Sequence, residues 1–126
     1  IVRTAEVQPW DFLNAVSARD MRRSLELFNL LPSKSYVWTY TLLCGRIREL
    51  IVVKALYARG QGRELSATLK LLSWLVKTHL TWARRFSMAE LVAALEGAVD
   101  VELALKGSAD SRTALLLWIT NILRKS

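Results

Sequence analysis

The sequence contains little of what builds a disulfide scaffold, a loop-rich fold or a membrane anchor. Its 126 residues include five glycines, two prolines and one cysteine, Cys44. A single cysteine cannot form an internal disulfide, which favours a reducing, cytoplasmic setting. The longest apolar runs, such as ALLLWI at 114–119, are far shorter than the ~20 residues that cross a bilayer. We therefore expect no membrane partner.

Motifs of enzymes and cofactor sites are also missing. Neither of the glycine-rich loops that cradle phosphate groups occurs, and no nucleophile is accompanied by a base and an oxyanion-binding loop. The chain has one histidine, His79, and one cysteine, Cys44. A metal site usually takes three or four ligands. We predict no catalytic, cofactor-binding or metal-binding residues, and interpret His79 as partly buried and Cys44 as a small apolar side chain.

Apolar side chains and positive charge are abundant. Apolar residues make up 52% of the chain, and 18 Lys and Arg outnumber 11 Asp and Glu to give a net charge of +7. This length and composition predict one folded domain over residues 1–126. The positive charge favours an anionic partner, but the basic residues occur in small groups rather than in a run. The missing initiator methionine suggests a fragment of a larger protein.

The apolar residues recur with a helical period throughout, and no alternating strand pattern of useful length is present. We therefore predict an all-α fold, a compact bundle of six or seven helices. The expected helices span about residues 11–17, 20–31, 35–59, 63–71, 73–86, 87–106 and 110–123. Their expected start and stop signals are Asp11, Asp20, Ser35, Gly60 and Gly62, the capping box of Ser87 and Glu90, Gly107, and Asp110 or Ser111.

Residues 62–86 imitate a helix-turn-helix motif, in which a short helix is followed by a break and a second helix. A groove-reading helix needs polar side chains on its exposed face, whereas Trp74, Leu80 and Trp82 place apolar bulk over much of this one. Ordinary packing of a helix pair is therefore the favoured interpretation.

Two charged residues lie within the apolar arc expected for the helix over 87–106. That arc contains Leu91, Leu95 and Val99, and Glu102 and Lys106 fall on it four residues apart. The acid precedes the base, which is the better order for a helical ion pair, and Lys106 lies in the last turn, where a cation is favoured. We interpret the two as a structural ion pair at the edge of the core. A catalytic Lys–Glu site is the alternative, but no nucleophile or second base accompanies it.

The last helix is apolar nearly all round between Ala114 and Leu123. Such a helix is either central in its domain or buried on a second side by a partner. Because large apolar side chains anchor interfaces, we predict Leu117, Trp118 and Ile122 as protein-interface residues.

Four segments in order resemble the C-terminal domain of the delta subunit of bacterial DNA polymerase III, part of its sliding-clamp loader. They are DFLNAVSARDMRRSLELFNLL at 11–31, GRIRELIVVKAL at 45–56, ARRFSMAELVAAL at 83–95 and VELALKG at 101–107. The resemblance covers about residues 10–123 and is looser between 59 and 80. Its most specific pieces are Arg48-x-Leu50 with Lys54, Arg85-Phe86-Ser87 leading into Glu90-Leu91, and an acid before Lys106-Gly107. Either Asp100 or Glu102 fills that acidic position.

The resemblance implies a helical collar domain, through which five clamp-loader subunits join into a ring. Its partners would be the helical collar domains of the other subunits. Contact with the sliding clamp would belong to N-terminal ATPase-like domains that this chain lacks, which would make it a non-catalytic C-terminal assembly module in DNA replication. The alternative function is a basic helical domain that contacts the phosphates of DNA.

Overall fold

The computed structural model describes residues 8–60, 73–107 and 110–125. Within these ranges the regular elements are six α-helices and a short 3-10 helix, so the predicted all-α class is confirmed. The elements are α1 (Pro9–Ser17), α2 (Met21–Leu30), η1 (Ser33–Ser35), α3 (Tyr36–Ala58), α5 (Ser73–Ala83), α6 (Met88–Lys106) and α7 (Ser111–Leu123). The helix expected over 63–71 falls outside the described residues.

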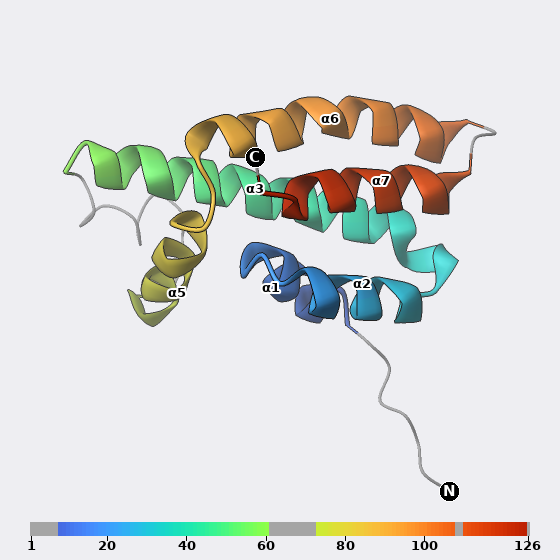
Figure 1. Cartoon of the computed structure of the whole chain (residues 1–126), viewed down its shortest axis with the longest axis horizontal. Helices are drawn as coiled ribbons and strands as arrows, with labels where there is room; N and C mark the ends of the chain where they lie inside the picture. The colour runs from blue at the N-terminus through green and yellow to red at the C-terminus, as the bar shows by residue number, and fades with distance from the viewer. Residues whose placement is uncertain (1–7, 61–72, 108–109, 126) are drawn as a thin grey trace, which may run out of the picture.

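Helix α3 is the centre of the bundle. Its 23 residues give it a length of about 35 Å, and it contacts α1, α5, α6 and α7. Helices α6 and α7 pack against each other along one side of α3. The pair α1 and α2 packs on another side. Helix α5 lies near the C-terminal end of α3 (Figure 1). In the described part of the chain, no helix is both long and apolar enough to span a bilayer.

Helix starts follow the sequence signals in three places. The side chain of Asp20 accepts the backbone N–H of Arg23 at the start of α2. Ser87 and Glu90 form the predicted capping box at the start of α6. Asp110 accepts the N–H groups of Arg112 and Thr113 at the start of α7. Each cap satisfies backbone donors that the first turn of a helix leaves unpaired.

One predicted helix start and one predicted cap conformation are wrong. Helix α1 begins at Pro9, so Asp11 lies in its first turn and does not cap it. Proline is well suited to this position because its missing N–H would be unpaired there in any case. Helix α6 ends at Lys106, as predicted, but Gly107 has a φ of −105°, outside the left-handed region that we expected for it. Gly60, at φ +74°, does adopt the left-handed conformation after α3.

The core is one continuous cluster to which all six α-helices contribute, α5 through Ala83. Phe28 is fully buried and stacks on Tyr36, with ring centroids 5.7 Å apart. Cys44 is also buried, and its burial raises the pKa of the thiol, so that it behaves as the small apolar side chain that we expected. On α3, Tyr36, Leu43 and Leu50 face inward, while Val37 is exposed.

Candidate protein-interaction surface

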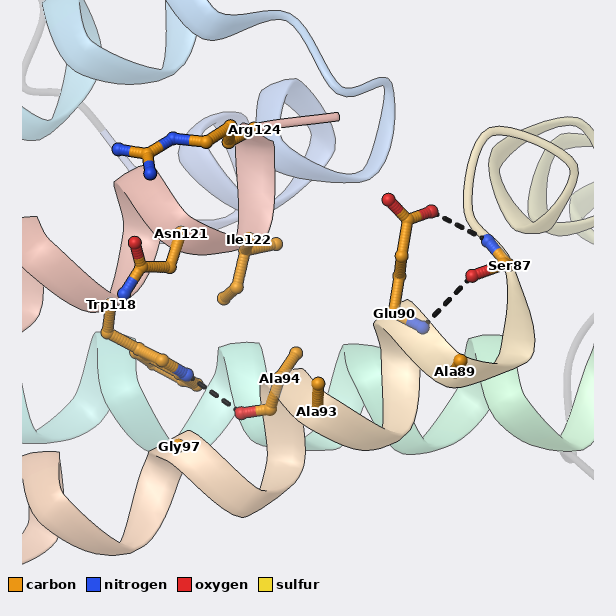
Figure 2. Close-up of a pocket in the computed structure, with 10 residues that line it drawn as sticks. All are labelled: Ser87, Ala89, Glu90, Ala93, Ala94, Gly97, Trp118, Asn121, Ile122 and Arg124. Atoms are coloured by element: carbon orange, nitrogen blue, oxygen red, sulfur yellow. Dashed lines mark hydrogen bonds between the residues drawn. The ribbon is translucent and has the colours of Figure 1, made fainter. Parts of the chain in front are cut away.

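A groove of about 390 Å³ runs between α6 and α7 (Figure 2). Small side chains form its α6 wall, and larger side chains of α7 form the other. These lining residues are Ala89, Ala93, Ala94 and Gly97 on α6, and Trp118, Asn121 and Ile122 on α7. Ala89, Ala93 and Gly97 recur every fourth position, which places them on one side of α6 and keeps that wall low.

Trp118 forms the floor of the groove. Its indole Nε1 donates a hydrogen bond of 2.8 Å to the carbonyl oxygen of Ala94, and its ring lies 5.4 Å from that of Tyr40 on α3. A Cβ atom at Gly97 would lie 3.4 Å from Trp118 Cδ1, so the indole packs directly on the glycine backbone. The absent side chain of Gly97 thus allows α6 and α7 to approach closely.

The three predicted interface residues are in two different environments. Trp118 and Ile122 are only 4% and 7% exposed, because this side of α7 packs against α3 and α6. Only the edges of these two side chains reach the groove. Leu117, which is 62% exposed, points outward. Asn121 is exposed one turn further along, at the groove.

Arg19 fixes one end of the groove, although no neighbouring residue in the sequence marks it for this role. Its guanidinium binds both carboxylate oxygens of Glu90, at 2.9 and 2.6 Å. It also donates to the carbonyl oxygens of Arg85, Leu123 and Arg124. These contacts tie the start of α6 to the end of α7. We call this cluster the Arg19 junction.

The backbone of Arg19 is also unusual. Its φ of +58° is left-handed, in the turn between α1 and α2, a conformation that side chains other than glycine seldom adopt. The guanidinium carbon lies 4.7 Å from the centre of the Phe86 ring, and the side chain is almost entirely buried. A charge so buried requires the full set of partners that the junction provides.

A second polar cluster joins α3 to α5 and α1. Arg46 donates to Asn14 and Ser17 on α1 and lies 4.5 Å from the Trp82 ring centre. Glu49 is 3.0 Å from Nε2 of His79. The hydrogen bond with His79, aided by the charges of His79 and Arg46, lowers the pKa of the Glu49 carboxyl. His79 thus has a structural role, and no group of three metal-ligating side chains occurs among the described residues.

Residues 6–122 match the family of the DNA polymerase III delta subunit, C-terminal domain. The chain belongs to this family. Its fold is similar to that of the Bacillus subtilis DNA clamp loader delta protein, with a TM-score of 0.78 and 23% sequence identity. The match covers 99% of this chain and 38% of that protein, so the chain spans well under half of its length. No curated protein sequence matches the chain.

The residues that carried the resemblance are structural parts of this delta C-terminal domain. Phe86 lies under the guanidinium of Arg19, and Ser87 and Glu90 form the capping box of α6. Lys54 Nζ donates to the carbonyl oxygen of Ala83 at 3.3 Å. The segment from Ala83 to Glu90 is thus held in place at both of its ends.

The pair of Glu102 and Lys106 is a surface feature of the domain. Lys106 Nζ donates to Glu102 Oε1 at 3.0 Å, and both side chains are exposed. Val99 and Leu103 are exposed as well, so the apolar arc that we expected around Val99 does not face the core. The inward face is formed by Leu91, Ala94, Ala98 and Val101, because α3 and α7 contact α6 from that side.

Several arginines serve the fold rather than an outside partner. Arg19 and Arg46 are bound internally, as described above. Arg112 donates to Tyr36 and Asn29 and lies 5.2 Å from the Phe28 ring centre. The basic surface available to an anionic partner is therefore smaller than the net charge indicates.

Proposed function

We propose that this chain is the collar domain of a clamp-loader delta subunit and that it holds the loader together during DNA replication. Membership of the delta C-terminal family supports an assembly role, and the absence of enzyme motifs in the sequence favours a domain without catalysis. In this proposal the chain is the C-terminal part of a longer cytoplasmic protein. N-terminal ATPase-like domains of that protein contact the sliding clamp.

The main support for the proposal is the groove between α6 and α7 with Leu117 beside it. Leu117 and Asn121 are four residues apart on the outward side of α7, next to the edges of Trp118 and Ile122. An exposed leucine beside an apolar floor resembles the central anchor of an interface. The low wall of Ala89, Ala93 and Gly97 lets another helix approach to the 8–10 Å that is typical of packed helices.

We assign this groove to a helix from the collar domain of a neighbouring loader subunit. The groove follows two helices for about ten residues of α6, roughly 15 Å. Its floor is apolar, and Glu90 and Arg124 make one end polar, at the Arg19 junction. An elongated apolar groove with a polar end fits the apolar face of an amphipathic helix.

Reconstitution of the loader tests the proposal. The chain is mixed with the other purified subunits, and the mass of the complex is measured by size-exclusion chromatography with light scattering. We expect Leu117→Arg to reduce complex formation about tenfold or more, since it places a charge at the interface. Leu30→Arg on α2 is the matched control, because Leu30 is also 62% exposed. Failure of the wild-type chain to join any complex would contradict the proposal.

Contact with DNA phosphates is the second candidate function, favoured by exposed arginines such as Arg84 and Arg85. Binding of this kind falls steeply with salt because each neutralised phosphate releases counterions. Titration with primed DNA at two salt concentrations tests it, and no binding at the lower concentration would exclude it.

A further inference from the structure

The outward side of α6 is a second apolar surface without a partner. Val92, Val99 and Leu103 are all exposed, at spacings that keep them on one side of the helix. At 100° per residue, the three stripe residues lie about 120–160° around the helix axis from Gly97 and about 80–120° from Ala93, both of which line the groove. A helix bound in the groove would therefore leave this outward stripe uncovered. In Figure 1, α6 forms the upper edge of the bundle.

Two carboxylates run beside the outward stripe. Glu96 and Asp100 are exposed one turn apart, on the side of the stripe that faces the groove. Among the described residues, neither side chain takes part in an ion pair or a hydrogen bond. Glu90 and Glu102, in contrast, are paired with Arg19 and Lys106. Glu96 and Asp100 are thus the two acids of α6 whose charges no basic side chain offsets.

This acidity is local to α6. The helix carries four acidic residues and one lysine, a net charge of −3, so the rest of the chain, whose total is +7, sums to +10. A surface that combines an apolar stripe with unpaired carboxylates selects a partner with apolar and basic side chains. It repels the phosphates of nucleic acid for the same reason.

We propose that Val92, Val99 and Leu103, flanked by Glu96 and Asp100, form a second docking surface for a basic amphipathic helix of another clamp-loader subunit. The inference rests on the proposed function and adds a second partner to it. The stripe is straight and about 16 Å long from Val92 to Leu103, which matches the apolar face of a helix. Because the stripe and the groove lie on different sides of α6, the two occupants are different subunits.

Pairwise binding tests this inference. The chain is titrated with each of the other purified loader subunits separately, and the affinity of each pair is measured. We expect the double variant Glu96→Lys with Asp100→Lys to weaken binding to one subunit about tenfold or more, and Leu117→Arg to weaken binding to a different subunit. Asp11→Lys with Glu26→Lys changes the net charge equally on α1 and α2, and we expect it to leave both pairs unchanged.

The outcomes separate the two proposals. If the charge reversal acts like its control, or weakens the same pair as Leu117→Arg, the second surface is wrong while the proposed function stands. A homodimer of the chain that depends on Glu96 and Asp100 would likewise overturn the assignment to another subunit. If the wild-type chain binds no loader subunit, both proposals fail. Rising salt should weaken the pair that uses the acidic surface more than the other.

Discussion

The inward and outward sides of α6 and α7 use the same kinds of residue for different purposes. Trp118 and Leu117 are neighbours in one apolar run, yet Trp118 is 4% exposed and Leu117 is 62% exposed. The side chains of the Arg19–Glu90 pair are only 6% and 18% exposed, whereas those of the Glu102–Lys106 pair are in solvent. Residue type alone thus does not separate the contacts that hold the domain together from the surfaces left for partners.

Trp118→Ala, on the inward side of α7, should lower the free energy of unfolding more than any other variant considered. It leaves a cavity against Gly97 and Tyr40 and removes the hydrogen bond to Ala94. We expect a loss of about 3–5 kcal/mol in the free energy of unfolding, measured by urea denaturation followed by circular dichroism. A loss no larger than that of Leu117→Ala would contradict the distinction between the two sides.

Arg19→Ala should be the next largest change. It removes one partner of a largely buried ion pair, leaves the Glu90 carboxylate without that partner, and releases the end of α7 from the start of α6. We expect a loss of about 3 kcal/mol or more, measured in the same unfolding experiment. Arg22→Ala is the control, since Arg22 forms an exposed pair with Glu26, and it should change little. Equal effects of the two variants would show that the Arg19 junction adds nothing to stability.

Glu49 lies between these extremes, because its side chain is partly exposed while its partner His79 is buried. The folded state lowers the pKa of Glu49 from its usual 4.5. Ionised Glu49 therefore stabilises the fold above about pH 4.5, and this contribution is lost as the pH falls through the lowered folded pKa. Glu49→Gln should cost under about 1 kcal/mol near neutral pH and flatten the acid side of a stability–pH profile. An unchanged acid slope would contradict this role.

Lys106→Ala should have the smallest effect on the free energy of unfolding, because it changes only the outward side of α6. The pair with Glu102 is exposed, and surface pairs of this kind contribute about 0.5 kcal/mol or less. We expect the free energy of unfolding, measured by urea denaturation, to fall by about 0.5 kcal/mol or less. A loss comparable to that of Arg19→Ala would mean that the outward pair also supports the core.

Signals within a few residues could be predicted from the sequence. The capping box of Ser87 and Glu90, the caps at Asp20 and Asp110, and the ion pair of Glu102 with Lys106 each involve residues at most four apart. The physics of one helix turn is enough to find them. The all-α class followed from the same periodicity.

The Arg19 junction could not be found in this way. Its partners come from Arg85, Glu90, Leu123 and Arg124, 66 to 105 residues along the chain, and nothing beside Arg19 indicates them. The split between Leu117 and Trp118 was hidden for a related reason. A helix that is apolar all round does not reveal which side meets its own core until its neighbours are placed.

Cysteine labelling at Leu117 tests the central claim most directly. Cys44 is buried, so a cysteine introduced by Leu117→Cys can be labelled selectively by a maleimide. We predict rapid labelling in the free chain and at least about tenfold slower labelling once the clamp-loader subunits are added, while Leu30→Cys reacts at the same rate in both states. If the labelling rate of Leu117→Cys does not change when a complex forms, the outward side of α7 is not an assembly surface.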